Sequence, residues 1–378
     1  MLIGLEMLTA MSWANAVMLA VGGLLIYLAI VKEYEPVLLI PIGVGAILAN
    51  IPGAGMGLDL RAITTGQHVE AVLLPLYRAG IETELFPLLL FIGIGALTDF
   101  GPLLSNPRMV LVGAAGQFGI FLVLLLALAT GRFTLNEAAS IGIIGAIDGP
   151  TSIFVASQLA PHLLAPIAVA AYTYMSLVPI IQPPIMRLLT TRRERGVRMP
   201  YTARVVSRRE RILFPIIVTL LTGLIAPQAS PLIGFLMFGN LLRESGVVDR
   251  LARAAGSELA NITTIFLGIT IGATMVGESF ANAQTLIILI LGILAFAVDT
   301  AAGVLFGKLL YLLTRGKFNP LIGAAGISAF PMAARVVNKI GLEEDFDNFL
   351  LMHAMGANAA GQVASVVAGG IVLALMMR

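Results

Sequence analysis

Long, uninterrupted apolar runs limit the possible folds of this chain more strongly than any other feature. The runs at 13–31 and 284–313 are long enough to cross a bilayer, which takes about 20 apolar residues. Hydrophobic residues make up 58% of the chain and charged residues only 12%, whereas a soluble domain carries about 25% charged residues. We therefore expect an integral membrane protein.

The runs are continuous rather than alternating with a period of two, so the spans are expected to be helices and the fold all-α. The 40 glycines and 19 prolines fit broken, closely packed helices. The segment before Trp13 contains no Lys or Arg and the run after it is long enough to span, so we expect a retained helix and no signal peptide. Spanning or nearly spanning segments are predicted at 13–31, 35–51, 85–98, 109–130, 212–226, 231–242, 262–276 and 284–313.

The motif GAIDGPTSIF at 145–154 places Asp148 beside a Gly-Pro pair inside apolar sequence. A carboxylate is costly at this depth, and a Gly-Pro pair breaks a helix where freed carbonyl oxygens can join the carboxylate around a cation. The motif therefore predicts an ion site. The structural alternative is a helix cap or half of an internal ion pair.

A basic connector at 187–211 holds nine Arg residues against Glu194 and Glu210. Loops close to membrane helices retain Lys and Arg on the cytoplasmic side, so we expect this connector to be cytoplasmic. Its charge is that of a topology determinant, and we expect no nucleic-acid partner. Zero cysteines exclude disulfides and thiolate chemistry, and no nucleotide-binding motif or catalytic triad is present in the sequence.

The two halves of the chain resemble each other weakly in an ungapped alignment that sets Gly145 on Gly326 and Pro150 on Pro331. Repeats with interrupted segments in matching positions are typical of transporters whose site lies between the halves. We expect two inverted repeats with broken helices. The predicted organisation is an N-terminal scaffold with its connecting loop at 1–84, a first repeat at 85–186 with a broken helix at Asp148, the connector at 187–211, and a second repeat at 212–378 with broken helices near Ser328 and Asn358.

Several long motifs resemble the beta subunit of the sodium-pumping, biotin-dependent decarboxylases, and the likeness runs over nearly the whole chain. They are KEYEPVLLIPIGVGAILANIPGAG at 32–55, DGPT at 148–151, AAYTYMSLVPIIQPPIMRLLTT at 170–191, NPLIGAAGIS at 319–328, PMAARV at 331–336 and LLMHAMGANAAGQVAS at 350–365. Ala357 departs from the pattern, since many relatives are expected to have proline there.

The resemblance implies a subunit that decarboxylates carboxybiotin with uptake of a proton and couples this step to sodium export. It implies catalytic roles for Asp148, Tyr174 and Arg335. The sodium-binding residues that it implies, together with oxygen donors from the same motifs, are Asp148, Thr151, Asn319, Gly323, Ser328 and Asn358.

The chemistry of these side chains agrees with a sodium site, because sodium is a hard cation that prefers oxygen ligands. A buried carboxylate can hold either sodium or a proton, which couples the two ions. Alternatives remain for several residues: Asn319 and Ser328 can be interhelical hydrogen-bonding residues, Tyr174 an interfacial tyrosine, and Arg335 a partner of the acidic run 343–347.

Asp299, in AFAVDTAAGV, is a second intramembrane acid that can be an ion ligand or a proton carrier. It lacks a neighbouring proline, so we rank it as a structural or second-tier site. The histidines His68, His162 and His353 show no spacing typical of metal ligands.

The expected cofactors are sodium and carboxybiotin carried by a partner. The resemblance implies a carboxyltransferase, a biotinyl carrier protein or domain, a small single-span membrane subunit and other copies of this chain as partners, in the cytoplasmic membrane of a bacterium or archaeon. The alternative function is a stand-alone, ion-coupled secondary transporter of a small carboxylate, which broken helices and repeats fit equally well.

Overall fold

The computed structural model describes residues 11–67, 69–200 and 204–377, and every regular element in this part of the chain is helical. The α-helices are α2 (Trp13–Val31), α3 (Pro36–Ala49), α4 (Leu60–Thr64), α5 (Leu74–Tyr77), α6 (Leu85–Leu97), α7 (Gly101–Ser105), α8 (Met109–Ala115), α9 (Phe118–Ala129), α10 (Leu135–Gly142), α11 (Gly149–Leu159), α12 (Leu164–Ser176), α13 (Val178–Leu189), α14 (Arg192–Arg195), α15 (Arg208–Ile225), α16 (Ser230–Ser245), α17 (Asp249–Ala254), α18 (Ala260–Ala273), α19 (Gly277–Phe280), α20 (Ala283–Leu313), α21 (Met332–Glu344) and α22 (Leu351–Met376). Short 3-10 or π turns are η1 (Arg78–Glu82), η2 (Ile143–Ala146), η3 (Pro161–Leu163), η4 (Pro227–Ala229), η5 (Ala255–Leu259) and η6 (Pro320–Gly326).

Among the described residues, five helical stretches are long and apolar enough to cross a membrane, or up to seven if two bent pairs each count as one span. The expectation of an all-α, multi-pass membrane protein is therefore confirmed. The five stretches are Trp13–Val31, Met109–Ala129, Asp249–Ala273, Ala283–Leu313 and Leu351–Met376.

Most predicted segments coincide with helices, but two differ in an informative way. The segment predicted at 109–130 is interrupted at Gly116 and Gln117, where α8 ends and α9 begins. The segment predicted at 262–276 belongs to a stretch that starts at Asp249, because the polar turns of α17 and η5 continue into α18. Charged residues in those turns hide this part of the helix from a search for apolar runs.

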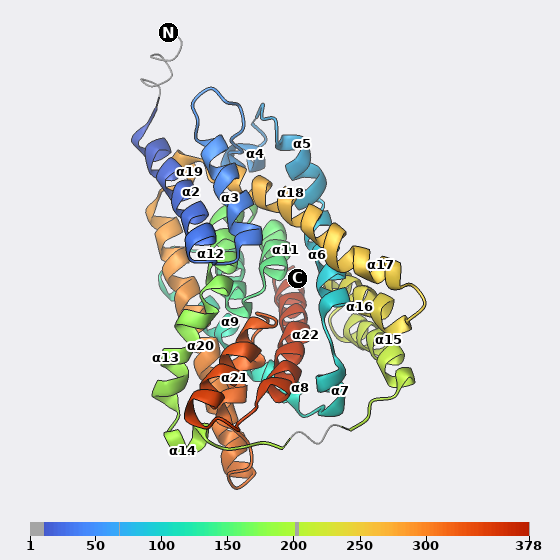
Figure 1. The fold of residues 1–378 in the computed structure, drawn as a ribbon. Coiled ribbons are helices and arrows are strands. Elements are labelled where there is room, and N and C mark those ends of the chain that lie inside the picture. The colour runs from blue at the N-terminus through green and yellow to red at the C-terminus, as the bar shows by residue number, and fades with distance from the viewer. Residues whose placement is uncertain (1–10, 68, 201–203, 378) are drawn as a thin grey trace.

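One group of helices, α2, α3, α6, α16 and α18, packs along one side of the molecule (Figure 1). Glycines let these backbones approach closely. A Cβ added to Gly45 of α3 would lie 2.3 Å from the Ile269 carbonyl oxygen, and one added to Gly95 of α6 would lie 1.9 Å from the Leu236 carbonyl oxygen. Close backbone contact through small residues is how membrane helices associate without a hydrophobic driving force.

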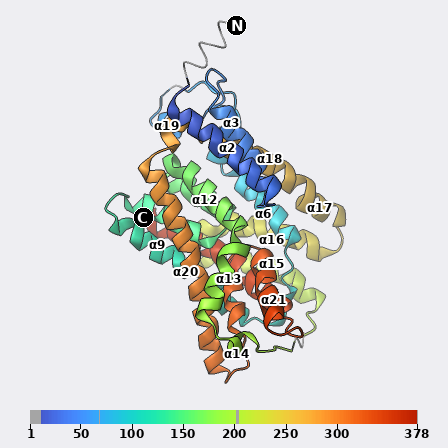
Figure 2. The same cartoon turned by 60° about the vertical axis from the view of Figure 1, so that its left-hand side comes forward.

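A second group surrounds two interruptions of the chain. We call residues 143–148 the first break and residues 319–331 the second break. Helix α20 runs past both, and α22 packs against η6, α8 and α11 (Figures 1 and 2). The two breaks meet directly, since the backbone N–H of Ser328 donates to the Ala146 carbonyl oxygen at 3.4 Å. Segments that the internal alignment superposes thus come together in space.

The connector contains α14 and lies at one end of the molecule, beside α21 and the end of α20 (Figure 1). Its arginines pair with the acidic run 343–347, which begins in the last turn of α21 and continues beyond it. Arg187 contacts Glu343 and Arg195 contacts Glu344, each at 2.6 Å. The hydrogen bonds that Arg198 donates hold the pKa of Asp345 below its ordinary value. These pairs fasten the connector to the second half of the chain.

Candidate functional site

The first break places Asp148 in the buried interior of the molecule. The turn η2 ends at Ile147, which has a left-handed backbone with φ of 51°. Asp148 then caps α11, and Pro150 stands in the first turn of that helix. Proline is favoured there because it has no N–H that needs a partner. Local sequence therefore stops one helix and starts the next at the acidic residue.

The carboxylate of Asp148 is 3% exposed and is held by side chains from two distant parts of the chain. Its Oδ2 accepts hydrogen bonds from the Thr151 hydroxyl at 2.8 Å, the Ser365 hydroxyl at 2.9 Å and the Gln362 amide at 3.2 Å. We call these four residues the acidic cluster. Capping explains the contact with Thr151, but Gln362 and Ser365 come from α22, so Asp148 is more than a helix cap.

The break predicted near Asn358 is wrong, because α22 runs as one continuous helix from Leu351 to Met376. This helix presents a polar stripe to both breaks. Asn358, Gly361, Gln362 and Ser365 recur at spacings of three and four residues, which puts them on one helix face about 10 Å long. The Gln362 end of the stripe faces Asp148, and the Asn358 end faces the second break. One helix therefore contacts both interruptions.

Ser328 and Asn358, two of the predicted sodium ligands, both make hydrogen bonds where the second break meets α22. The Ser328 hydroxyl donates to the Gly361 carbonyl oxygen at 3.1 Å, and the Asn358 amide donates to the Ile327 carbonyl oxygen at 2.6 Å. The other amide atom, Asn358 Oδ1, is buried and has no hydrogen-bond partner among the described residues. Among the described residues, no side-chain hydrogen bond joins this group of neutral oxygens to the acidic cluster.

Asn319 lies elsewhere. Its side-chain amide donates to the carbonyl oxygens of Arg195 at 2.8 Å and Val197 at 2.9 Å, both in the connector. Its Oδ1 accepts from the Leu321 N–H at 3.0 Å. Asn348 donates to the same Arg195 oxygen. In this conformation Asn319 fastens the connector and makes no hydrogen bond to the acidic cluster.

Gly323 serves close packing in this structure. A Cβ at this position would lie 1.9 Å from the carbonyl oxygen of Gly303 in α20. Only glycine lets η6 approach α20 so closely, so this position fixes the packing of the second break against α20.

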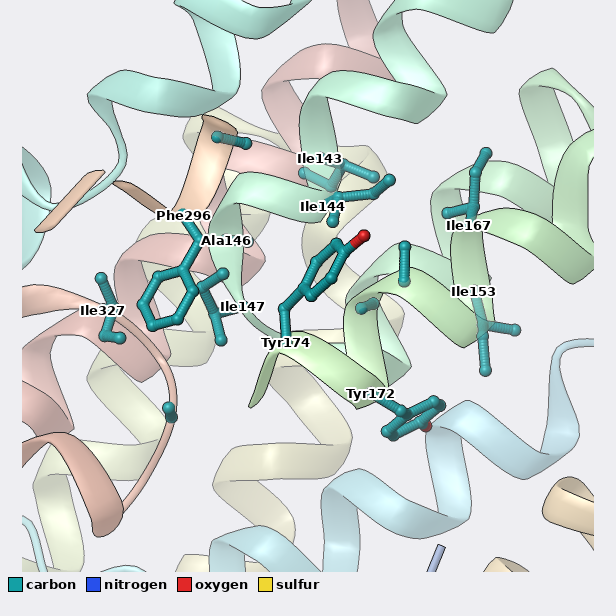
Figure 3. Close-up of a cluster of buried hydrophobic side chains, with 14 of the residues drawn as sticks. Ile143, Ile144, Ala146, Ile147, Ile153, Ile167, Tyr172, Tyr174, Phe296 and Ile327 are labelled. Carbon is teal, nitrogen blue, oxygen red and sulfur yellow. The ribbon is translucent and has the colours of Figure 1, made fainter. Parts of the chain in front are cut away.

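The two tyrosines of the YTY sequence take different places. Tyr174 lies in the buried cluster around the first break with Ile144, Ile147 and Phe296 (Figure 3), and its hydroxyl donates to the Leu289 carbonyl oxygen at 2.5 Å. Tyr172 packs against Gly149, where a Cβ would lie 2.1 Å from the ring. The buried Tyr172 hydroxyl has no hydrogen-bond partner among the described residues. The tyrosine in contact with the turn after Asp148 is therefore Tyr172, which the sequence analysis did not select.

Asp299 is fully buried in the middle of α20. Its Oδ1 accepts a hydrogen bond from the Gly119 N–H at the start of α9, and its Oδ2 lies against Gly145 of the first break. The first contact agrees with a structural role that fixes α9 to α20. Asp299 approaches the first break from the side of α20, whereas the acidic cluster is closed by α22.

The two histidines that the structure describes make their contacts outside both breaks. His162 meets Glu137 at 2.7 Å, and the His353 ring lies 3.3 Å from the Met199 carbonyl oxygen. His68 lies outside the described residues.

Arg335 is exposed near the connector end and lines a cavity with a volume of 390 Å³. Asn338, Lys339, Leu342, Glu343 and Leu351 complete the lining. The acidic run 343–347 is paired with connector arginines, and no ion pair of Arg335 or Lys339 occurs among the described residues. Two cations four positions apart on α21 therefore remain available to an anion.

Comparison with known proteins gives a consistent family assignment. Residues 14–376 match the family described as the Na+-transporting oxaloacetate decarboxylase beta subunit. The chain is 51% identical to the methylmalonyl-CoA decarboxylase subunit beta of Propionigenium modestum, covering 97% of this chain and 95% of that protein. It is 50% identical to the oxaloacetate decarboxylase beta chain of Klebsiella pneumoniae, covering 95% and 94%. The glutaconyl-CoA decarboxylase subunit beta of Acidaminococcus fermentans is 52% identical, with coverage of 97% and 94%.

Proposed function

Because this chain belongs to the family of sodium-transporting decarboxylase beta subunits, and is thus a membrane subunit of a decarboxylase coupled to sodium transport, we propose that it decarboxylates carboxybiotin and exports sodium through the acidic cluster. The observation that carries the proposal is a buried carboxylate at a helix break, bonded by Thr151, Gln362 and Ser365. By itself, this buried carboxylate fits a stand-alone carboxylate transporter equally well. The family assignment is what favours the decarboxylase subunit.

The acidic cluster has the chemistry of a site that exchanges sodium for a proton. Hydroxyl groups rotate freely, so Thr151 and Ser365 can donate to a carboxylate or turn a lone pair toward a cation. Asp148 supplies one negative charge, which either a sodium ion or a proton neutralises. Occupancy by one ion excludes the other, and this exclusion couples the two.

We place carboxybiotin at the connector end, with Arg335 attracting its carboxylate. Decarboxylation breaks the bond between the ureido nitrogen and the carboxylate carbon, CO2 leaves, and the nitrogen takes up a proton. In our proposal Asp148 passes on that proton after it has released sodium. We assign Tyr174 the role of holding the α12 side of the site through its bond to the Leu289 carbonyl oxygen.

This scheme requires a biotinyl carrier and a carboxyltransferase on the cytoplasmic side, where we place the connector. A small single-span subunit and further copies of this chain complete the proposed complex. We also propose that the halves are inverted repeats and that the helices around both breaks move together against the N-terminal scaffold. The meeting of Ser328 with Ala146 supports a common body for the two breaks.

The test is Asp148→Asn in the purified complex reconstituted into vesicles. Asparagine keeps the size and a hydrogen-bonding group but removes the charge, so decarboxylation and sodium transport should both collapse. Ser157→Ala on the same helix is the control, because the Ser157 hydroxyl donates to the Phe154 carbonyl oxygen and not to the acidic cluster. Sodium-dependent turnover at the wild-type level in Asp148→Asn would remove the acidic cluster from the mechanism.

A further inference from the structure

A second basic cavity at the connector end shares no lining residue with the cavity of Arg335. Its volume is 310 Å³, and its charge comes from Arg193 of α14 and from Arg315 in the turn after α20. Val197, Tyr311, Leu312 and Gly316 complete the lining. The cavity therefore lies where α14 meets the end of α20 (Figures 1 and 2).

The two arginines of this cavity differ from the neighbouring Lys308 in having no acidic partner. Lys308 lies 3.4 Å from Glu194, and this pair fastens α14 to α20. No ion pair of Arg193 or Arg315 occurs in the part of the chain that the structure describes. The partial negative charge at the end of a helix, about half an elementary charge, is too small to neutralise two guanidinium groups. The cavity therefore carries an unbalanced positive charge.

The turn after α20 fixes the backbone of Arg315 beside the cavity. Arg315 and Gly316 both have left-handed backbones, with φ of 54° and 84°. The Gly316 N–H donates to the Tyr311 carbonyl oxygen at 2.8 Å, and a Cβ added to Gly316 would lie 3.6 Å from the Tyr311 ring. The Thr314 hydroxyl accepts from the Phe318 N–H at 3.1 Å, which closes the turn. Because the turn is already ordered, an anion that binds Arg315 has less backbone entropy to remove.

The part of α20 that leads to the cavity has an exposed apolar face. Leu305, Leu309 and Leu312 recur at spacings of four and three residues, so they lie on one side of the helix, and all three are exposed. Leu312, which lines the cavity, is 70% exposed. Because α20 is long and apolar enough to cross a membrane, we expect this face to contact hydrocarbon. The apolar sequence ends just before Arg315, which puts the cavity at the boundary between hydrocarbon and lipid headgroups.

From this arrangement we infer that the cavity binds the phosphate of an anionic phospholipid, with an acyl chain of the same lipid along Leu305, Leu309 and Leu312. Arg193 and Arg315 supply planar, fork-shaped donors that match phosphate oxygens. Basic pockets between membrane helices are suited to such headgroups. A free phosphate ion carries the same charge but makes no contact with the leucine face, which distinguishes the lipid from a soluble anion. The inference does not depend on the ion chemistry proposed for Asp148.

The test is native mass spectrometry of the purified complex in a neutral detergent, titrated with dioleoylphosphatidylglycerol. Wild type should bind one such lipid per chain in preference to dioleoylphosphatidylcholine, which has the same acyl chains and no net charge. Arg193→Gln combined with Arg315→Gln should weaken this binding roughly thirtyfold, which is about 1 kcal/mol for each arginine. Arg108→Gln combined with Arg209→Gln is the matched control, because both arginines are exposed and neither lines the cavity. The control should bind the lipid as wild type does.

Several results would overturn the inference. They are equal binding of the two lipids by wild type, wild-type affinity in a folded variant that lacks Arg193 and Arg315, and displacement of the lipid by excess inorganic phosphate. Lipid binding that appears only after the other subunits are removed would assign the cavity to an acidic segment of a partner instead. If the double variant does not fold, phosphatidylglycerol with a photoreactive acyl chain should label residues 305–312 of the wild-type complex, and the absence of label there would refute the site.

Discussion

Ser365→Ala is the most informative single change, because this residue reaches Asp148 only through the tertiary fold. The Ser365 hydroxyl lies 2.9 Å from Asp148 Oδ2, and both groups are buried. Alanine removes the oxygen with almost no change in packing. The carboxylate then keeps Thr151 and Gln362 as donors, so the cluster should persist with one contact fewer.

The stabilisation that the ionised Asp148 carboxylate loses in Ser365→Ala follows from the negative charge of this acceptor. A hydrogen bond to a charged group contributes about 1.5–3 kcal/mol. We take the lower part of this range, about 1.5–2 kcal/mol, because two other donors remain. Every 1.4 kcal/mol changes an equilibrium constant about tenfold. The hydroxyl stabilises the ionised carboxylate but not the protonated acid, so at pH values where protons occupy Asp148 the sodium concentration for half-maximal activity should rise roughly ten- to thirtyfold. The shift should grow as the pH falls, since the protonated acid loses less than the sodium-binding form.

The assay is sodium-dependent decarboxylation by the purified complex at several pH values, with Ser152→Ala as the matched control. The Ser152 hydroxyl donates at 2.8 Å to the backbone oxygen of Asp148 rather than to its carboxylate. This control removes the same kind of group beside the same acid but should leave the sodium requirement near that of wild type. Equal sodium requirements in the two variants would refute the reasoning.

Three other changes address residues near the connector. Asn319→Ala should speed protease cleavage of the connector and leave the sodium requirement unchanged, because its amide bonds connector carbonyls; a raised sodium requirement would instead make Asn319 a sodium ligand. Arg335→Gln should raise the concentration of carboxylated carrier needed for half-maximal rate at unchanged sodium requirement, and an unaltered carrier requirement would argue against the anion cavity. The lowered pKa of Asp345 means that its pairing with Arg198 stabilises the connector fully above the ordinary pKa of 3.8 and is lost as the pH falls through the lowered value. Connector amides, corrected for intrinsic rates, should exchange hydrogen faster only below pH 3.8, whereas Asp345→Asn should make them exchange fast at neutral pH.

The amino-acid sequence specifies the class of fold, the main spans and the position of the first break. Apolar runs long enough to cross a bilayer require helices. At the first break, Asp148 caps α11, and Gly149-Pro150 directly after it starts this new helix, all through local backbone geometry. The internal alignment of Gly145 with Gly326 also indicates the second break. These features depend on neighbours in the chain, and the structure has the first break and most of the spans where the pattern predicts them.

Which side chains meet is set by tertiary packing instead. Gln362 and Ser365 stand far along the chain from Asp148, and no local pattern indicates that α22 turns this face toward it; the polar spacing of three and four positions is the one available signal. Packing likewise places Tyr172 against Gly149 and binds Asn319 to the connector. The residues that share a site depend on the rotation and depth of each packed helix, because these are fixed by contacts between distant segments.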